Sequence, residues 1–359
     1  MGFRYKKSTD SSWYDIVYTE GITTANGSFS LRVDNLASSQ TYDYEAYMHV
    51  WNGSGYVEIV KSGQFTTEAA AAFTPTGWLE LPATTGGEDL VITMYKSGDV
   101  SGLASDRNYT MNYSKERYAA LWVAYTLTEA DVVTGNTSSG NWSFNNSVFS
   151  GGYQVGVTQS IGSYPSNYAN ASSYSRGHQI PSADRTTSNT ANAQTYLLTN
   201  QTPQRQNKFN GSIWGSLETA GRGFVVTENN KGNANYNGSF KKTDVLYIIT
   251  GPSYGKEGTS ETPEYLVSNG SVSPESVPIP KYYWKVFLKV KMNGEVVDQA
   301  CAIGFWFEHR DYEGESYTSY VKSVNQIEAW TGFDLFANLP DGLEEAVEAN
   351  TNWTAFRDF

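Results

Sequence analysis

The chain has 359 residues, and its 37 acidic and 25 basic side chains give a formal net charge of −12 at pH 7. This length suggests two or three domains, and the acidic balance argues against a protein that binds nucleic acid through a positive surface as a whole. The single cysteine, Cys301, excludes an intrachain disulfide and a zinc site built on paired cysteines. No apolar stretch reaches the 18 residues that a membrane-spanning helix requires.

The first 67 residues have the pattern of a small all-β module. Polar and apolar side chains alternate strictly over residues 29–33 and 42–50, which predicts strands, and the Asn-Gly and Ser-Gly pairs at 52–55 mark turns. With the segment at 63–67, these strands resemble the second half of a fibronectin type III-like β-sandwich whose first strands are short or absent. His49 then falls on a strand face.

Residues 68–77 differ in composition from both of their neighbours. An acidic residue and four alanines precede Pro75. We interpret the segment as a linker, and the alternative is one helical turn that the proline ends.

Residues 78–359 alternate between predicted strands and predicted helices. Strands are expected at 90–95, 121–127, 244–250 and 281–292, and helices at 211–221, 321–331 and 342–349. Between residues 134 and 173 the chain is rich in Gly, Asn and Ser and holds no Lys or Arg, which is typical of a long functional loop. The pattern predicts an α+β fold with a central antiparallel sheet.

Two segments of this second region carry most of the chemistry. Residues 175–178 read Ser-Arg-Gly-His and hold one of only three histidines, and a second segment runs from Asn210 to Glu218. Together they offer a base that titrates near neutrality, a cation for a phosphate, a neutral oxygen ligand and a carboxylate. These are the groups of a metal-assisted phosphodiester hydrolase. The sequence contains no His-Glu-x-x-His, P-loop or Gly-x-Ser-x-Gly motif.

These segments resemble the DNA/RNA non-specific endonucleases, a family with a ββα-metal active site. That family carries Asp-Arg-Gly-His, then Asn-x-x-Pro-Gln, then an Asn followed after seven residues by Glu, with an Arg four residues further on. The matching positions here are Ser175 to His178, Asn200 to Gln204, Asn210, Glu218 and Arg222. Segments at 247–252, 279–286, 327–332 and 339–340 continue the likeness in family order, so that it covers most of the chain.

The resemblance implies an α+β, ββα-metal nuclease fold for residues 78–359. It also implies an endonuclease that hydrolyses the phosphodiester bonds of DNA and RNA with Mg²⁺ as its cofactor, although Mn²⁺ or Ca²⁺ can occupy the same ligand shell. DNA and RNA are the expected partners, with no membrane span and no obligate protein partner.

Three residues are the candidates for the chemical step. His178 is the candidate general base, because an unperturbed imidazole has a pKa near ~6.5 and is largely neutral at pH 7. Asn210 is the candidate metal ligand, since Mg²⁺ keeps several waters and needs few protein oxygens; the alternative is a simple turn at Asn210-Gly211. By resemblance Glu218 orients metal-bound water, and the alternative is a solvated surface carboxylate.

Five further residues are candidates for binding or support. Arg176 and Arg222 can contact phosphate or serve the structure alone, and Arg222 can also form an ion pair with Glu218 one turn before it. By resemblance Asn200 helps to hold the site, and Gln204 and Arg205 are weaker candidates for substrate contact or support.

The sequence departs from the family at two points. Ser175 stands where the family has Asp, which bears on the support of the site and not on its chemistry. Some members also carry an extra arginine upstream, and the region 134–173 offers none. Lys96, Lys115 or Arg117 could take its place.

Two other functions remain open. The protein could be a surface or glycan-binding protein whose nuclease region is catalytically degenerate, or an enzyme that hydrolyses a smaller phosphodiester. Low charge and a β-sandwich module favour an extracytoplasmic protein, secreted or attached to a cell surface, with any signal segment ahead of Met1.

Overall fold

The computed structural model describes residues 1–17, 41–66, 77–83, 90–96, 106–133, 140–149, 154, 173–186, 188–259, 261–266 and 276–359. The strand predicted at 29–33, residues 68–76 of the predicted linker and most of the predicted loop at 134–173 lie outside these ranges. The chain divides into two compact units, one of Met1–Thr74 with Met292–Gln299 and the other of Pro75–Lys291 with Ala300–Phe359.

The first unit contains a four-stranded antiparallel sheet in the order β2-β1-β3-β4. Its strands are β1 (Gly2–Lys7), β2 (Tyr14–Val17), β3 (Thr41–Trp51) and β4 (Tyr56–Thr66). β3 confirms the strand predicted at 42–50, and His49 lies on it, 3.2 Å from Glu58 of β4. The turn at 52–55 forms because the side-chain oxygen of Asn52 accepts two backbone N–H groups. The likeness to fibronectin type III and the domain boundaries stay predictions.

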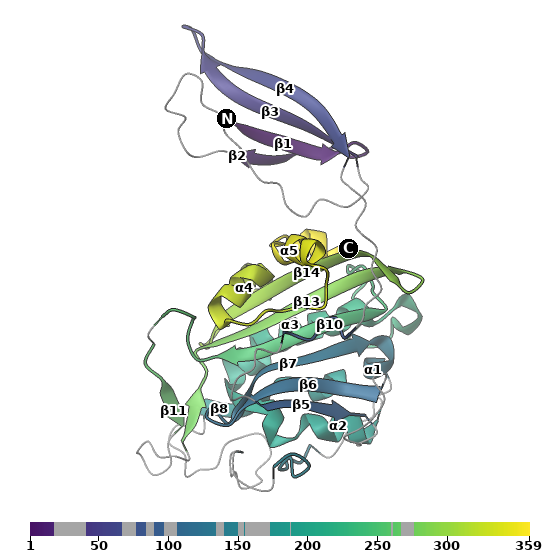
Figure 1. Ribbon diagram of the computed structural model, residues 1–359, viewed down its shortest axis with the longest axis vertical. Coiled ribbons are helices and arrows are strands. Elements are labelled where there is room, and N and C mark those ends of the chain that lie inside the picture. The colour runs from purple at the N-terminus through teal and green to yellow at the C-terminus, as the bar shows by residue number, and fades with distance from the viewer. Residues whose placement is uncertain are drawn as a thin grey trace. The chain divides into compact units, whose positions relative to one another are not determined.

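The second unit is built on a seven-stranded sheet, as the α+β prediction requires (Figure 1). In sheet order its strands are β15 (Val321–Lys322), β14 (Val296–Glu308), β13 (Tyr282–Asn293), β10 (Val245–Ser253), β7 (Ala119–Thr128), β6 (Arg107–Ser114) and β5 (Leu90–Tyr95). The predicted strands at 90–95, 121–127, 244–250 and 281–292 are confirmed, whereas β6 and β14 were not predicted. Two further sheets have two strands each, β8 (Tyr174–His178) with β9 (Gln201–Arg205), and β11 (Glu264–Leu266) with β12 (Val277–Ile279).

Helices accompany the large sheet and connect its strands. They are α1 (Glu129–Val133), α2 (Asn189–Thr195), α3 (Gly215–Val225), α4 (Val324–Thr331), α5 (Asp341–Glu348) and α6 (Trp353–Arg357), with a π-helix η5 (Gln206–Trp214) and short 3-10 turns η3 (Ser182–Asp184), η4 (Leu198–Asn200), η6 (Glu228–Asn230) and η7 (Tyr317–Tyr320). The helices predicted at 321–331 and 342–349 are confirmed as α4 and α5, with residues 321–322 in β15 instead. Among the residues that the structure describes, no helix is long and apolar enough to cross a membrane.

The long strands of the sheet are buried on both faces, because alternate side chains meet different helices. On one face Trp306 packs against Trp330 of α4, with ring centroids 4.8 Å apart. On the other face Phe287 packs against α6 and lies so near α3 that a Cβ added at Gly221 would meet its ring at 3.3 Å. The α3 face therefore receives every second residue of β13, including Lys285.

Carboxyl groups gather where α4 and α5 pack together beside β13 and β14 (Figure 1). Burial, reinforced by the nearby carboxylates of Glu328, Glu344 and Asp334, raises the pKa of Glu348 to about 10. The pKa values of Glu328 and Glu344 are both raised to about 7, chiefly by burial. The folded protein thus keeps these glutamate carboxyls protonated at pH values where the unfolded chain has released the protons, because the ordinary pKa of a glutamate is 4.5. Stability should fall as the pH rises from that value towards 10.

We expect Glu348→Gln to stabilise the protein at pH 8 by at least about 1 kcal/mol, because the amide is never ionised and one pKa unit corresponds to ~1.4 kcal/mol. Near pH 4.5 the gain should vanish. Urea unfolding at both pH values measures the difference, with Glu345→Gln on the exposed side of the same helix as the control. An equal effect of Glu348→Gln at both pH values would contradict the assignment.

Candidate active site

The candidate base, His178, lies at the end of the short two-stranded sheet that β8 and β9 form. His178 is the last residue of β8 and faces Gln201 of β9 in the antiparallel register. Two residues later, the backbone N–H and C=O of Ile180 bond to the side chain of Asn200, each at 3.0 Å. Asn200 is fully buried, and its supporting role in the site stays a prediction that these two contacts favour.

The His178 ring is enclosed by two aromatic residues. Its centroid lies 4.6 Å from that of Trp142 and 4.9 Å from that of Tyr196. Burial lowers the pKa of His178 to about 4, so the ring is neutral at pH 7. Within the described residues its Nε2 atom has no hydrogen-bond partner. An enclosed ring nitrogen without a partner is rare and costs roughly 1–3 kcal/mol, which makes it a candidate for a functional role.

Ser175 joins the same strand to the candidate metal ligand. The amide nitrogen of Asn210 donates to Ser175 Oγ at 3.0 Å, and that hydroxyl donates to the carbonyl oxygen of Gln204 at 3.2 Å. The amide of Asn210 is thereby oriented, and its oxygen remains the end that can bind a cation. Ser175 therefore supports Asn210 at the position where the family has Asp.

The helix that carries Asn210 differs from the prediction. We expected one helix over 211–221, but it begins at Gln206, and its first nine residues form the π-helix η5 before α3 continues to Val225. π-helical turns are rare and frequently occur at functional sites. Because the π-helix has a different pitch, Asn210 and Glu218 do not have the α-helical register that their spacing suggested.

Arg222 is committed to a buried network. Its guanidinium donates to Asp184 at 2.8 Å, to Asn235 at 2.9 Å and to Thr219 at 3.0 Å. Asp184 also accepts from the hydroxyl of Tyr125 at 2.9 Å. The hydrogen-bonded ion pair of Arg222 is thus with Asp184 and not with Glu218, although the charge of Glu218 still raises its pKa. The network holds the segment that follows His178 against α3.

Glu218 lies half-buried among these charges. Burial raises its pKa to about 7, against the opposing influence of Lys285 and Arg222 and with a further rise from Asp184. Sequence reasoning missed Asp184 and Lys285. The signal for Lys285 was a charged residue inside the apolar run of β13, and the signal for Asp184 was its place in the segment that follows His178.

The remaining candidates are Arg176 and Gln204, which are buried, and Arg205, which is partly exposed. Arg176 is buried on the same side of β8 as His178, and its guanidinium lies 5.9 Å from the centroid of the Trp142 ring. Gln204 is fully buried behind Gly177. Arg205 is partly exposed at the other end of the strand pair, where its backbone N–H donates to Nε2 of His309 at 2.9 Å.

The three cations considered as substitutes for an upstream arginine lie elsewhere. Lys96 bonds to Asp131 at 3.0 Å, Arg117 lies 5.2 Å from the ring of Tyr254, and Lys115 is exposed. Neither Asp131 nor Tyr254 is among the candidate catalytic residues. The cations that the structure places with those residues are Arg176, Arg222 and Lys285.

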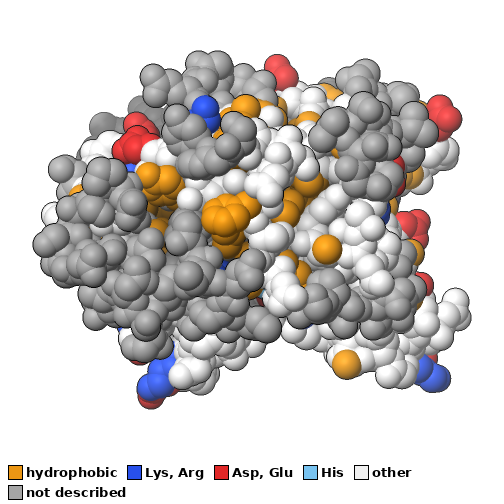
Figure 2. Space-filling view, turned by 90° about the horizontal axis from the view of Figure 1, so that it is seen from below, with side chains coloured by type: hydrophobic (Ala, Val, Ile, Leu, Met, Phe, Trp, Pro, Cys, Tyr) orange, Lys and Arg blue, Asp and Glu red, His pale blue; other side chains and the backbone are white. Residues whose placement is uncertain are grey.

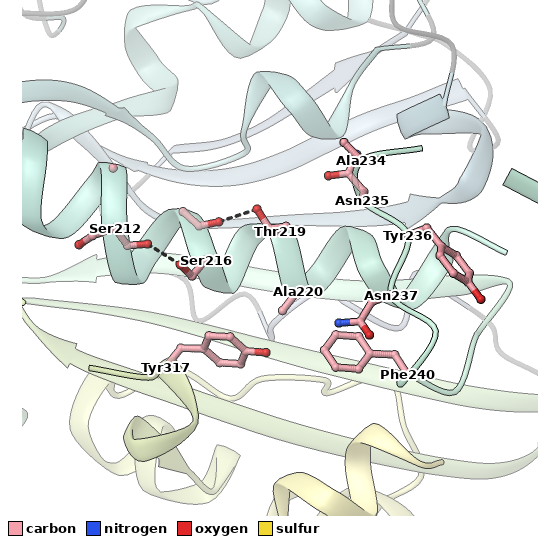
Figure 3. Close-up of a pocket in the computed structure, with 12 residues that line it drawn as sticks. Ser212, Ser216, Thr219, Ala220, Ala234, Asn235, Tyr236, Asn237, Phe240 and Tyr317 are labelled. Carbon is pink, nitrogen blue, oxygen red and sulfur yellow. Dashed lines mark hydrogen bonds between the residues drawn. The ribbon is translucent and has the colours of Figure 1, made fainter. Parts of the chain in front are cut away.

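A cavity of about 570 Å³ lies along the solvent side of η5 and α3 (Figure 3). It is lined by Gly211, Ser212, Gly215, Ser216, Thr219, Ala220, Ala234, Asn235, Tyr236, Asn237, Phe240 and Tyr317. None of the predicted site residues is among them. Thr219 and Asn235 bond Arg222, which therefore separates this cavity from Asp184.

The residues fit a divalent cation held by few protein ligands. Among the described residues, no group of three or more His, Cys, Asp or Glu side chains could hold a metal ion. A hard cation that keeps most of its waters does not need such a group. Asn210 offers one oriented oxygen, and Glu218 offers a carboxylate on the following helix.

Comparisons with known proteins find similar nucleases. A family model described as DNA/RNA non-specific endonuclease matches residues 86–342. A nuclease of Nostoc sp. is 27% identical over 251 residues, which cover 68% of this chain and 76% of the relative. A nuclease of Serratia marcescens is 25% identical over 247 residues, covering 67% and 77%. The mitochondrial nuclease of Saccharomyces cerevisiae is 26% identical over 192 residues, covering 52% and 54%.

A solved structure of the EndoG/EndoGI complex contains a chain of the same fold. It superposes with a TM-score of 0.50 at 18% identity, covering 66% of this chain and 85% of that chain. The likeness confirms the ββα-metal nuclease fold predicted for the second unit.

Gly177 is required by the close approach of Gln204. A Cβ at this position would overlap the Gln204 side chain, which crosses directly behind the backbone of β8. We expect Gly177→Ala to destabilise the second unit by roughly 1–3 kcal/mol, the usual cost of overpacking. Removing the obstruction in Gly177→Ala with Gln204→Ala should recover most of that loss in chemical denaturation. A double variant no more stable than Gly177→Ala would show that the contact is not the cause.

Proposed function

Because the chain belongs to the DNA/RNA non-specific endonuclease family, and is therefore a nuclease, we propose that it is a Mg²⁺-dependent, sugar-non-specific endonuclease that leaves 5′-phosphate ends. The observation that carries the proposal is the pairing of two features on one strand. β8 ends in a neutral histidine with an unused ring nitrogen, and it orients Asn210 through Ser175.

His178 is proposed to act as the general base. With its pKa lowered to about 4, the imidazole is neutral throughout the neutral range and can accept a proton from an attacking water. Because an imidazole with this pKa is a weak base, it has to release the accepted proton soon after the water oxygen has bonded to phosphorus. The rings of Trp142 and Tyr196 fix the imidazole orientation, so that little ordering is needed in the transition state.

Asn210 is proposed to bind the metal ion through its side-chain oxygen, with Glu218 accepting hydrogen bonds from the waters of that ion. When bound, the cation would supply Lewis-acid stabilisation of the scissile phosphate and the leaving 3′-oxygen. Ser175 keeps the amide oxygen of Asn210 available by holding its nitrogen. The ionised carboxylate of Glu218 can accept from waters through both of its oxygens, whereas the protonated form donates through one of them, so the groups that set its ionisation become part of the mechanism.

Phosphate contact is proposed for Arg176, which lies on the face of β8 that also carries His178. Arg222 serves instead to position α3, because three acceptors already use its guanidinium. Phosphate contacts carry no sequence information, so no base specificity is expected.

The acidic net charge suits an enzyme that releases its product. On the face in Figure 2, the described side chains of both charges lie mainly towards the rim, and hydrophobic and other uncharged groups lie between them. Such a surface gives slow, salt-sensitive association and not tight retention of a polyanion. An extracytoplasmic location remains our proposal, since a non-specific nuclease inside a cell without an inhibitor would attack the nucleic acid of that cell.

We expect His178→Ala to lower kcat by roughly 10²–10⁴-fold on both plasmid DNA and RNA, because it removes the proton acceptor. Circular dichroism should show an unchanged fold. His49→Ala, which alters a histidine of the first unit, is the matched control and should retain activity. Full activity of His178→Ala would refute its role as the base. Hydrolysis of a small phosphodiester but not of either polymer, by the unaltered protein, would refute the nuclease assignment.

Metal removal tests the second half of the mechanism. We expect EDTA to abolish cleavage and Mg²⁺ to restore it. We also expect Ser175→Ala to raise the Mg²⁺ concentration for half-maximal activity by roughly tenfold, because it removes a hydrogen bond that supports Asn210. Ser216→Ala, on the exposed side of α3, should leave that concentration unchanged. Cleavage in EDTA at the full rate would exclude the metal role of Asn210.

A further inference from the structure

His309 is a histidine of the second unit that the proposed mechanism does not yet use. It directly follows β14, and its imidazole packs among the rings of Tyr174, Phe209 and Tyr283, with centroids 5.7, 5.1 and 5.0 Å away. Its backbone N–H donates to the carbonyl oxygen of Lys281 at 2.7 Å. His309 is therefore fixed to the segment that leads into β13 of the large sheet.

Both ring nitrogens of His309 form hydrogen bonds. Nδ1 lies 2.8 Å from the carbonyl oxygen of Pro280, and Nε2 lies 2.9 Å from the backbone nitrogen of Arg205. A carbonyl oxygen only accepts and a backbone N–H only donates, so Nδ1 carries the proton and Nε2 carries none. Burial lowers the pKa of His309 to about 4, against the opposing influence of the bond to Pro280, which agrees with a neutral ring. The imidazole thus joins the large sheet to the backbone of Arg205 in one tautomer.

Arg205 is the residue at which the helix of the candidate metal ligand begins. It ends β9 and is the N-cap of η5, and its own side chain makes no capping hydrogen bond. Asn210 lies on the same η5, immediately after Phe209, which is fully buried and packs on the His309 ring. A ligand that projects from a helix is placed by the contacts that fix the helix. The bond from Arg205 to His309 therefore bears on the position of Asn210.

The turn that follows His309 makes further contacts with the start of η5. The backbone N–H of Tyr312 donates to the carbonyl oxygen of Lys208 at 2.9 Å, and the side chains of Glu313 and Lys208 form an ion pair. The ring of Tyr312 lies 6.1 Å from that of Phe209. The ion pair is exposed to solvent, and such pairs contribute little. Among the side chains of this turn, His309 is thus the one whose hydrogen bond is enclosed by aromatic rings.

We propose that His309 is a positioning residue that fixes the start of η5, so that the side-chain oxygen of Asn210 is held where it can bind the metal ion. The inference rests on the proposed role of Asn210. Two constraints then act on this ligand, since Ser175 holds its amide nitrogen and His309 holds the backbone from which it projects. His309 would touch neither the substrate nor the metal ion. Its loss should weaken metal binding, because groups that orient a ligand change metal affinity by roughly 10–100-fold.

Two amide substitutions separate the roles of the two ring nitrogens. The amide oxygen of His309→Gln reaches the position of Nε2 and can accept from Arg205, whereas the shorter side chain of His309→Asn reaches only the position of Nδ1 and can bond Pro280. We expect His309→Asn to raise the Mg²⁺ concentration for half-maximal plasmid cleavage by roughly tenfold, and His309→Gln to stay near the unaltered value. Arg310→Gln, which removes the bonds to Glu315 from the neighbouring residue, is the matched control and should change nothing. Equal Mg²⁺ requirements of His309→Asn and His309→Gln would overturn the inference.

Amide hydrogen exchange gives a second readout that needs neither metal nor activity. In His309→Asn the amides of residues 205–214 should exchange faster, while those of β13 keep their rate. Faster exchange throughout the second unit, or no change anywhere, would overturn the inference. An unaltered protein without nuclease activity would refute the proposed function instead, and the exchange rates would still test the link between His309 and η5.

If His309→Asn does not fold, the same hydrogen bond can be removed from its donor. The φ of Arg205 is −58°, which proline can adopt. Arg205→Pro therefore removes the N–H group, and Arg205→Ala retains it, with the arginine side chain absent from both. Arg205→Pro should need roughly tenfold more Mg²⁺ than Arg205→Ala for half-maximal cleavage. Equal requirements of these two variants would show that the bond to His309 does not position Asn210.

Discussion

The ion pair between Arg222 and Asp184 is the interaction on which the arrangement of this site depends. It joins α3, which carries Glu218, to the segment that leaves β8 after His178. Both side chains are buried, and Tyr125 of the central sheet donates to the same carboxylate. Breaking such a pair leaves a buried charge uncompensated and costs roughly 3–5 kcal/mol. The helix and the strand pair are thus fixed to each other and to the sheet by one acidic side chain.

Side-chain hydrogen bonds hold the other parts of the site. Asn200 clamps Ile180, two residues after the candidate base, and Ser175 connects β8 to Asn210. A serine can perform this task because one oxygen is enough to accept the hydrogen bond from Asn210. The same hydroxyl donates its own proton to the carbonyl oxygen of Gln204. In physical terms, a serine in place of the family Asp carries no negative charge and still accepts a hydrogen bond from Asn210.

Much of the fold was predictable from the sequence, because the period of apolar residues reports a strand that is buried on one or two faces. β5, β7, β10 and β13 were found in this way. β6 was missed although Tyr109, Met111 and Tyr113 of its core face alternate with polar residues. Two of those polar residues, Asn108 and Thr110, are also buried, and they are held there by hydrogen bonding and not by hydrophobicity. The sequence placed the helix after Asn210 but not the π-helix, because the turn type depends on packing around Trp214 and Phe209 that no local pattern encodes.

The residues of the candidate site also differ in whether local sequence could predict them. Resemblance to local family motifs singled out His178, Asn210 and Glu218 as candidates. The partners that set their charge and orientation come from distant parts of the chain, and sequence spacing carries no information about them. Lys285 is 67 positions from Glu218 by the numbering of the sequence. Asp184 was visible only as one acidic residue among the chain's 37 acidic side chains.

The positions of these cations also explain how an acidic protein can act on a polyanion. Exposed charges separated by more than about 8–10 Å are largely screened at physiological ionic strength, whereas buried charges are screened much less. Arg176 and Lys285 lie in the interior beside the groups that the mechanism uses. The net charge of −12 governs how the molecule approaches a polymer, but the local field at the site is set by a few buried side chains. An enzyme built in this way can have strong electrostatic stabilisation at one phosphate without retaining the strand that it has cut.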